Sequence, residues 1–372
     1  MRLPLRGRHR PIDRLQIRSA RCTGYDAAAL WELKVEPFDL VIRGGTVVTA
    51  TDMMRADIGI RAERIAAIAE GLDAGRHEID ARGLLVLPGG VDTHSHIEQL
   101  AATGLMNADT FESATRSAAF GGTTTVISFA AQHVGMNLTK VVEDYHRLAD
   151  KGAVVDYAFH MILADPTEEV LYRQLPPLVR EGHSSIKVFM TYDRLRIDDE
   201  KLLDVLAAAR DNGDLVMVHA ENHGMINWMA KRLLSRGYVD PKYHGVAHPR
   251  VCETEAFTRL IACAIYGLHP KKGTIAIGTD ADIAIWDPDM TVAIDDAMVK
   301  DRSGYTPWVG RTITGWPSTV IRRGTIIVEN GEILASAGSG RFLARSAGVA
   351  AKPTGRDAPE FDLRLNFQAK LR

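Results

Sequence analysis

The stretch GLLVLPGGVDTHSHIEQ, residues 83–99, joins an apolar run to two histidines that stand one residue apart, His94 and His96. The apolar residues are typical of a buried strand, and the paired glycines that follow are typical of its end. In an extended chain, residues i and i+2 point to the same side, so both imidazoles would face one point. Imidazole nitrogens are common ligands of zinc. The stretch therefore predicts either a strand that delivers two metal ligands or a chance pair of histidines on a loop.

Downstream of this stretch, apolar β-rich segments alternate with helical ones. The expected strands are TTTVISFA (123–130), VVDYAFHMIL (154–163), SSIKVFMTY (184–192) and DLVMVHA (214–220). The expected helices are NADTFESATRSAAFGG (107–122), EEVLYRQLPPLVREG (168–182) and DDEKLLDVLAAARDNG (198–213). Repeated β-then-α units predict an α/β fold with a parallel sheet, either an open doubly wound sheet or a (β/α) TIM-like barrel. No GxGxxG motif follows a strand, which disfavours dinucleotide binding.

Two of the expected helices carry specific sequence signals. In the helix at 107–122, Asp109 is the expected N-cap and Glu112 occupies the capping-box position. The helix at 198–213 is expected to bury one face. That face would contain Leu202, Leu203, Leu206 and Ala209.

The parts of the chain outside the alternating region divide it into domains. Residues 38–87 and 273–336 are both β-rich and broken by turn signals, and we expect them to form one small composite β-sandwich. Residues 88–264 would then hold the barrel. Residues 1–37 are a basic extension that we expect to be disordered: an extension upstream of the natural start, a targeting segment or a functional basic arm. Residues 337–372 form a C-terminal tail.

Composition excludes several classes of partner. The 372 residues carry a formal net charge of −2, which leaves no electrostatic footprint for nucleic acid or for an anionic membrane. No stretch approaches the roughly 20 apolar residues of a membrane span. Only Cys22, Cys252 and Cys263 are present, without CxxC spacing, which fits a reducing compartment and hence the cytoplasm.

Two further polar residues lie where chemistry is found in a (β/α) barrel, at the carboxyl ends of strands. Lys187 lies inside the expected strand at 184–192, and His219 ends the expected strand at 214–220. Taken singly, a strand lysine is commonly an edge or snorkelling residue, and a histidine is commonly a satisfied core residue. Combined with His94 and His96 at the ends of separate strands, they favour a metal site.

Most of residues 38–336 is covered by motifs that together carry a family resemblance. These motifs are FDLVIRGGTVVT, LPGGVDTHSHIEQ, ESATRSAAFGGTTTVISFA, DYAFHMI, SIKVFMTYD, VMVHAEN, KYHGVAHPR, IYGLHPKKGTIAIGTDADIAIWDP and TGWPSTVIRRG. In this combination the chain resembles the hydantoinase and dihydropyrimidinase family of the amidohydrolase superfamily. The resemblance implies a barrel flanked by a β-sandwich and a small cyclic amide or imide as substrate. It also implies a homo-oligomer, a tetramer in this family.

The same resemblance assigns roles to the residues singled out above. It implies two zinc ions bridged by Lys187 after that lysine has been carboxylated by CO₂, and a neutral buried amine is the chemical prerequisite for this step. His94 and His96 would bind one zinc ion and His219 the other. Tyr192 would point its hydroxyl at the substrate carbonyl. The implied reaction is hydrolytic ring opening of a hydantoin or dihydropyrimidine to an N-carbamoyl amino acid.

The resemblance also exposes a gap. The family's barrel continues with strands six to eight, which carry a further histidine ligand and an aspartate that acts as ligand and general acid/base. Here ETEAFTRLIACA (253–264) runs directly into IYGLHPKKG (265–273), and residues 88–264 fall short of the roughly 250 residues of a complete barrel. The sequence therefore predicts a truncated barrel, and the activity of this chain is in doubt.

Candidate replacements for the lost groups are few. His223 follows His219 by one helical turn but has no family precedent, and His244 and His248 are expected to be packing or surface residues. Alternatives to an active enzyme are a non-catalytic dihydropyrimidinase-like relative and an inactive gene remnant. Non-catalytic relatives typically lose the histidines and the lysine, whereas all four positions are intact here, which favours an enzyme lineage.

Overall fold

The structure is a computed structural model that describes residues 37–101, 104–259 and 275–346. The predictions made for residues 1–36 and 347–372 lie outside the described residues. All helices and strands below belong to the compact unit that begins at Phe38.

The two β-rich segments are joined in one sheet of nine strands. From the first segment come β1 (Phe38–Val48), β2 (Met53–Arg61), β3 (Arg64–Ala69), β4 (Gly75–Asp80) and β5 (Leu85–Pro88). From the second come β11 (Ile283–Ala293), β12 (Thr312–Arg322), β13 (Thr325–Glu329) and β14 (Glu332–Ile333). The order is β14-β13-β12-β11-β5-β1-β2-β3, and β4 pairs with β1. Strand β5 pairs with β1 and β11. The LVLP run therefore belongs to the nine-stranded sheet and not to the barrel.

Both β-rich segments contribute to one apolar core. Ile42, Ile58 and Val86 of the first segment pack in the same cluster as Ile283 and Ile321 of the second, and all five are fully buried. Burial of each such side chain stabilises the fold by about 1.5–3 kcal/mol. Both segments therefore contribute strands and core residues to one sheet.

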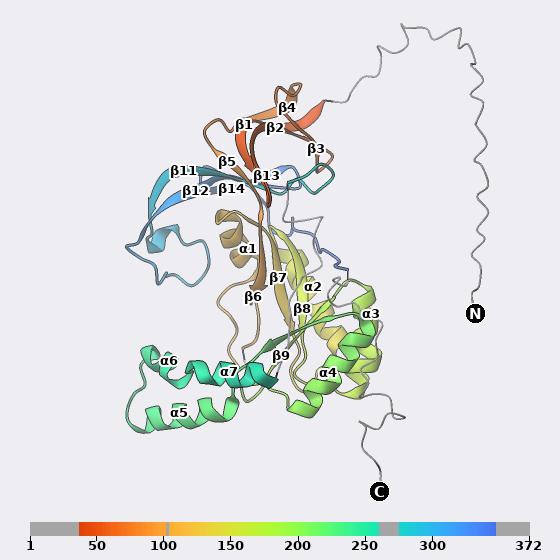
Figure 1. Ribbon diagram of the computed structural model, residues 1–372, viewed down its shortest axis with the longest axis vertical. Helices are drawn as coiled ribbons and strands as arrows, with labels where there is room; N and C mark the ends of the chain where they lie inside the picture. Colours follow the sequence, from red (N-terminus) through yellow and green to blue (C-terminus); the bar gives the residue numbers. More distant parts are fainter. Residues whose placement is uncertain (1–36, 102–103, 260–274, 347–372) are drawn as a thin grey trace, which may run out of the picture. The chain divides into compact units, whose positions relative to one another are not determined.

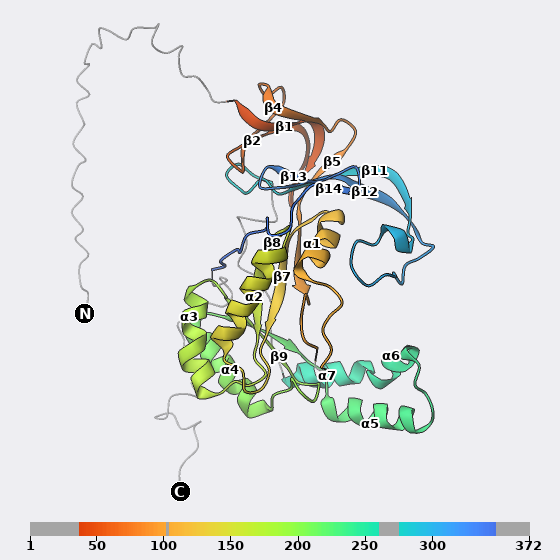
Figure 2. The ribbon, with the colours of Figure 1, turned by 180° about the vertical axis from the view of Figure 1, so that it is seen from behind.

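The intervening residues form a parallel sheet of five strands. Helices connect successive strands (Figures 1 and 2). The strands are β6 (Gly90–Ser95), β7 (Thr123–Ala131), β8 (Asp156–Ile162), β9 (Ser185–Phe189) and β10 (Leu215–His219), in the order β10-β9-β8-β7-β6. The crossovers hold α1 (Phe111–Phe120), α2 (Leu138–Gly152), the π-helical turn Val170–Gln174 with α3 (Leu175–Arg180), and α4 (Asp199–Asn212). Consecutive strands are neighbours throughout, which is barrel order. The predicted fold class is thus confirmed.

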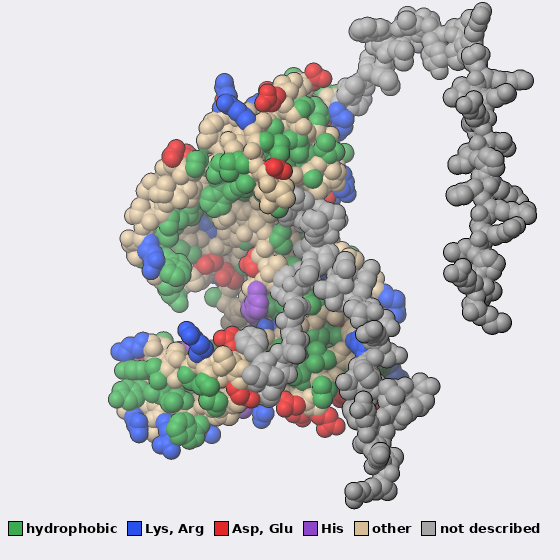
Figure 3. Space-filling model, in the orientation of Figure 1, with side chains coloured by type: hydrophobic (Ala, Val, Ile, Leu, Met, Phe, Trp, Pro, Cys, Tyr) green, Lys and Arg blue, Asp and Glu red, His purple; other side chains and the backbone are tan. Residues whose placement is uncertain are grey.

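Within the described residues, the parallel sheet of the barrel ends at its fifth strand, β10. Helices α5 (His223–Ser235), α6 (His244–Ala247) and α7 (Arg250–Arg259) follow β10, with short 3₁₀ turns at Pro241–Tyr243 and Asp296–Met298. In the described part of the chain no sixth parallel strand pairs with β10. Figure 3 shows hydrophobic side chains gathered on the surface near α5 and α6. The exposed ones include Trp228, Leu234, Tyr238, Val239 and Val246.

No helix within residues 37–101, 104–259 and 275–346 is both long enough and apolar enough to cross a membrane.

The two specific helix predictions are wrong in detail. The N-cap of α1 is Thr110, which forms a reciprocal capping box with Ser113, because Asp109 instead accepts hydrogen bonds from the Ser113 hydroxyl and from the backbone of Arg302. The buried face of α4 is centred on Val205 and includes the predicted Leu202 and Ala209. The other two leucines of the predicted face, Leu203 and Leu206, are exposed.

Part of the predicted C-terminal tail packs against the parallel sheet. The backbone of Gly340 donates to Ala153 O at 2.8 Å, and Tyr157 N donates to Arg341 O at 2.9 Å. A Cβ atom added at Gly340 would lie 1.9 Å from the carbonyl oxygen of Val155. Close backbone contact at this position therefore requires glycine.

Replacing Gly340 by alanine is expected to lower the free energy of unfolding by about 1–3 kcal/mol, because the backbone segment must move away from β8. Urea denaturation measures the change. The matched control is Gly245→Ala in α6, where no atom lies within 4 Å of the added Cβ and alanine favours the helix. Equal stability of the two variants would contradict the packing of residues 337–346 on the sheet.

Candidate functional site

The first two predicted ligands lie together at the carboxyl end of β6. His94 lies within the strand and His96 one residue beyond it, so the strand extends further than the sequence analysis expected. The two imidazole ring centroids are 5.3 Å apart. Phe129 of β7 contacts both rings, with centroid distances of 4.9 Å to His94 and 4.3 Å to His96. Both histidines are partly exposed to solvent.

Lys187 lies in the middle of β9 and is 5% exposed. Its ammonium nitrogen lies 5.2 Å from the ring centroid of Phe189 and 6.0 Å from that of Phe129. In the described ranges no carboxylate forms an ion pair with this nitrogen. Burial therefore lowers the pKa of Lys187 to about 8.

His219 ends β10, as the sequence predicts, and contacts the fifth candidate residue. Its ring stacks on Phe189 at 5.8 Å, and its Nε2 atom lies 3.4 Å from the hydroxyl of Tyr192. The same Nε2 atom lies 2.6 Å from an oxygen of Glu221. The rings of Phe129 and Phe189 thus form one apolar surface that contacts the two histidines of β6, Lys187 and His219.

Electrostatics show that these side chains form one cluster. Partial burial, followed by the nearby Lys187 ammonium, lowers the pKa of His94 below its ordinary value. Burial also lowers the pKa of His96, and the charges of Lys187 and His219 add to the effect. Neutral imidazoles and a readily neutralised amine are nitrogen bases in the form that binds metals. The structure thus brings all five predicted residues to one end of the sheet.

His, Cys, Asp and Glu side chains alone do not make a metal site here. Among the described residues, no three of these types lie close enough together to hold a metal ion.

Sequence analysis missed Glu221, which links two histidines. Its carboxylate contacts His219 Nε2 at 2.6 Å and His248 Nδ1 at 2.8 Å. Burial raises the pKa of Glu221, but hydrogen bonds from the two histidines outweigh it and hold that pKa below its usual value. The i, i+2 spacing of His219 and Glu221 was an available signal. The contact with His248, 27 residues away, was not.

A second missed residue, the histidine His160, lies next to the site. His160 of β8 is fully buried, with Nδ1 2.6 Å from the Ser185 hydroxyl and Nε2 3.0 Å from Thr93 O. Burial holds its pKa far below the ordinary value, so the ring is neutral. His160 therefore links β6 to β9 next to the candidate ligands.

The amine of Lys187 is expected to titrate near pH 8, more than two units below an ordinary lysine. Because the unfolded chain then binds more protons than the folded one between pH 8 and about 10.5, the free energy of unfolding should rise with pH across that window. Carbon-13 NMR of ¹³Cε-lysine protein, with the signal assigned by Lys187→Met, measures the titration. A midpoint near 10.5 would contradict the burial of this amine.

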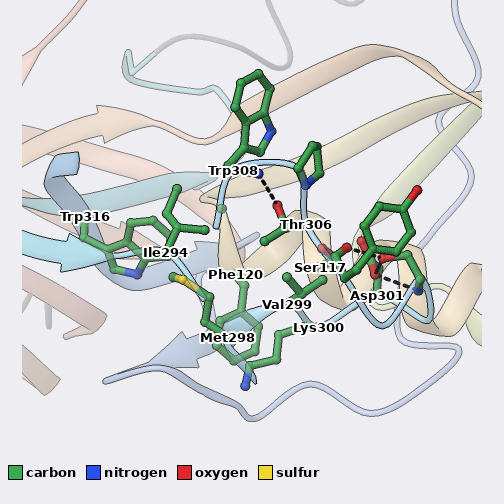
Figure 4. A pocket seen from close by; sticks show the side chains of 14 residues that line it. Ser117, Phe120, Ile294, Met298, Val299, Lys300, Asp301, Thr306, Trp308 and Trp316 are labelled. Atoms are coloured by element: carbon green, nitrogen blue, oxygen red, sulfur yellow. Dashed lines mark hydrogen bonds between the residues drawn. The ribbon is translucent and has the colours of Figure 1, made fainter. Parts of the chain in front are cut away.

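A separate cavity of about 490 Å³ lies between α1 and the 294–316 segment (Figure 4). Phe120, Met298, Trp308 and Trp316 form its apolar walls, and Lys300 lies over the Phe120 ring at 5.1 Å. None of the five candidate site residues lines it.

Comparison with known proteins gives a consistent result. A family model described as "Amidohydrolase family" matches residues 85–256. The D-hydantoinase of Geobacillus stearothermophilus is 42% identical over 238 residues, which are 62% of this chain and 50% of that protein. Over this match the chain thus spans about half the length of its curated relative.

A second relative aligns over nearly its whole length. The D-hydantoinase of Ralstonia pickettii is 27% identical over 453 aligned positions, which take in 82% of this chain and 99% of that protein. Because 453 positions exceed the 372 residues of the chain, the relative carries residues that have no counterpart here.

Solved structures agree with both matches. The D-hydantoinase of Bacillus sp. AR9 superposes with a TM-score of 0.78 at 26% identity, covering 83% of this chain and 99% of that one. The dihydropyrimidinase of Brevibacillus agri gives 0.77 at 26% identity, covering 82% and 98%. With the composite sheet, the barrel-ordered strands and the clustered residues at their ends, these matches show that residues 85–256 resemble the amidohydrolase family and that the chain is similar in sequence and fold to hydantoinases and dihydropyrimidinases.

Proposed function

We propose that this site serves the metal-dependent hydrolysis of cyclic amides, the ring opening of a hydantoin or dihydropyrimidine to an N-carbamoyl amino acid. His94, His96, Lys187 and His219 are the proposed metal ligands, and Tyr192 is the proposed contact to the substrate carbonyl. The observation that carries the proposal is the buried Lys187 amine, which contacts the same two rings, Phe129 and Phe189, as the three imidazoles and has no acidic partner in the described structure.

The residues present fit a pair of zinc ions in part. His94 and His96 offer two adjacent neutral nitrogens, and a carboxylated Lys187 would add the anionic oxygens that borderline cations accept. His219 fits less simply, because its Nε2 atom already contacts Glu221 at 2.6 Å. Binding a metal through that nitrogen requires the Glu221 contact to be given up.

When bound, the metal pair would polarise the substrate carbonyl and lower the pKa of water. The residues of this chain supply the remainder of the site. Burial, reinforced by the Glu221 charge, raises the pKa of the Tyr192 phenol, so it stays protonated and can donate to the developing oxyanion. The rings of Phe129 and Phe189 exclude water beneath the ligands, which strengthens electrostatic interactions at the site.

The truncation is expected to impair turnover more than metal binding. The described parallel sheet ends at β10, so the described residues lack the strand-eight aspartate that the family resemblance implies as general base. Loss of general acid–base catalysis typically costs about 10²–10⁴-fold in rate. Ring opening by this chain should therefore be slower by about that factor than in a complete relative.

The test uses the full chain supplied with zinc and bicarbonate. Zinc content is measured by plasma mass spectrometry, and ring opening of hydantoin and dihydrouracil is followed by the appearance of the ureido product. Bound zinc with slow ring opening is expected. Bound zinc without turnover would favour a non-catalytic relative, and absence of zinc would contradict the proposal. A rate within tenfold of a complete D-hydantoinase would contradict the loss of the general base.

We further propose that the protein acts in the cytoplasm, since its few cysteines fit a reducing compartment and Cys252 is a buried free thiol.

A homo-oligomer, a tetramer as in the family, is proposed because α5 and α6 expose apolar side chains that association would cover. Light scattering of the purified chain measures the subunit number, and a monomer at micromolar concentration would contradict it.

A further inference from the structure

From the contacts of its two ring nitrogens, we propose that His223 is a positioning residue that holds Tyr192 in place. The inference rests on the proposed role of Tyr192 and adds a residue to that site. His223 is the first residue of α5, and its Nδ1 atom lies 3.4 Å from the Thr191 hydroxyl. Its Nε2 atom lies 3.2 Å from an Asp193 oxygen. One ring therefore contacts the residues on both sides of Tyr192.

Tyr192 needs such support because its backbone is unusual. Its φ angle is +71°, a left-handed conformation that a bulky residue rarely adopts and that persists only where its surroundings enforce it. Leu195 N and Arg196 N both donate to Tyr192 O, and Ile197 N donates to Phe189 O at 3.0 Å. These backbone hydrogen bonds hold the turn between Phe189 and Ile197, but they do not fix the side chain of Tyr192.

The histidine is itself firmly held. The side chain of Asn222 caps α5 by accepting from Met225 N, and it donates to Glu255 of α7 at 2.6 Å. Asn222 N also donates to Cys252 O at 3.0 Å, and Asn227, one turn along α5, contacts His223 Nε2 at 2.8 Å. The position of the imidazole is thus set by α5 and α7 together.

One neutral tautomer satisfies the hydrogen bonds of the ring. The amide nitrogen of Asn227 lies 2.8 Å from Nε2, so Nε2 accepts, and the proton on Nδ1 is donated to the Thr191 hydroxyl. Asp193 contacts Nε2 at 3.2 Å without forming a hydrogen bond to it. Thr191 is 2% exposed and the Asp193 side chain 79%, so the Thr191 contact should contribute the larger share.

Holding the loop places the phenol where the proposed chemistry needs it. The Tyr192 hydroxyl lies 3.4 Å from His219 Nε2, and its ring lies 5.0 Å from the His219 ring. Without His223, the backbone of Tyr192 is free to leave the left-handed conformation, and the phenol leaves His219. The residue acts through Tyr192 and does not itself touch the reacting atoms.

The experiment follows the Tyr192 side chain and does not depend on turnover. The full chain is labelled with 3-fluorotyrosine, and the Tyr192 resonance in the ¹⁹F spectrum is assigned with Tyr192→Phe. In His223→Ala this resonance should shift toward that of an unconstrained tyrosine, while the other tyrosine resonances stay in place. His223→Gln keeps one donor and one acceptor and should restore at least half of the shift. Lys231→Ala, an exposed position on the same helix, is the matched control.

An unmoved Tyr192 resonance in His223→Ala overturns the inference. If that variant disturbs all tyrosines, Thr191→Val and Asp193→Asn decide instead: a shift confined to Tyr192 supports the inference, and none in either variant overturns it. Zinc content is measured on every sample. Failure to bind zinc in the parent protein would count against the proposed function, whereas the ¹⁹F result would still decide the role of His223.

Discussion

Replacement of Lys187 by methionine is expected to lower the affinity for zinc by more than about 100-fold, since the site loses the ligand that would join its two halves. Methionine fills nearly the same volume among Phe129 and Phe189, so the fold is retained. Zinc content after dialysis, measured by plasma mass spectrometry, gives the affinity change. Ring opening should fall to background in the same variant.

The same substitution is expected to raise the stability of the metal-free protein. The folded pKa of Lys187 is about 8, below the ordinary value of 10.5, so burying the ammonium at pH 7 opposes folding. Removing it should therefore increase the free energy of unfolding by roughly 1–3 kcal/mol at pH 7, and by less as the pH rises toward 10.5.

The matched control is Lys140→Met on the exposed surface of α2, where the lysine pairs with Asp144 at 2.7 Å. Neither zinc affinity nor stability should change there by more than a small amount. Unchanged zinc binding in Lys187→Met would remove this residue from the metal site.

Replacement of Asp156 by alanine is expected to destabilise the protein by about 3–5 kcal/mol. Asp156 is the first residue of β8 and is fully buried, and its carboxylate accepts hydrogen bonds from the guanidinium of Arg323 and from Arg341 N. Removing the carboxylate leaves the buried Arg323 cation with only the longer ion pair to Glu63, at 3.9 Å. Urea denaturation measures the loss.

A second variant separates the ion pair from packing. In Asp156→Ala/Arg323→Met both charges are gone, so much of the lost stability should return. Asp144→Ala, which breaks exposed contacts to Lys140 and Arg147, is the surface control and should cost no more than about 1 kcal/mol. Equal losses in Asp156→Ala and Asp144→Ala would show that the buried pair does not join the two sheets energetically.

Local patterns predicted most of the secondary structure, and errors arose where a tertiary contact competed. Asp109 satisfies the rule for an N-cap, but its carboxylate accepts from Arg302, 193 residues away, and Thr110 caps α1 instead. Leu203 and Leu206 are apolar residues at helical spacing, yet the sheet covers the arc of α4 centred on Val205. A periodic pattern of apolar residues indicates that a helix has an apolar face. It does not determine which part of the helix surface another element covers.

The sequence alone determined the residue types of the site and their places at strand ends, because strand periodicity and the i, i+2 rule act within one segment. The meeting of His94, His96, Lys187 and His219 over Phe129 and Phe189 was decided by the parallel order of four strands. Only the tertiary structure revealed the contacts of Glu221 with His248 and of His223 with the Tyr192 loop. Such contacts depend on how separate helices and strands pack against each other. The two side chains of each contact lie 27 or more residues apart, and no local rule along the chain determines the distance between them.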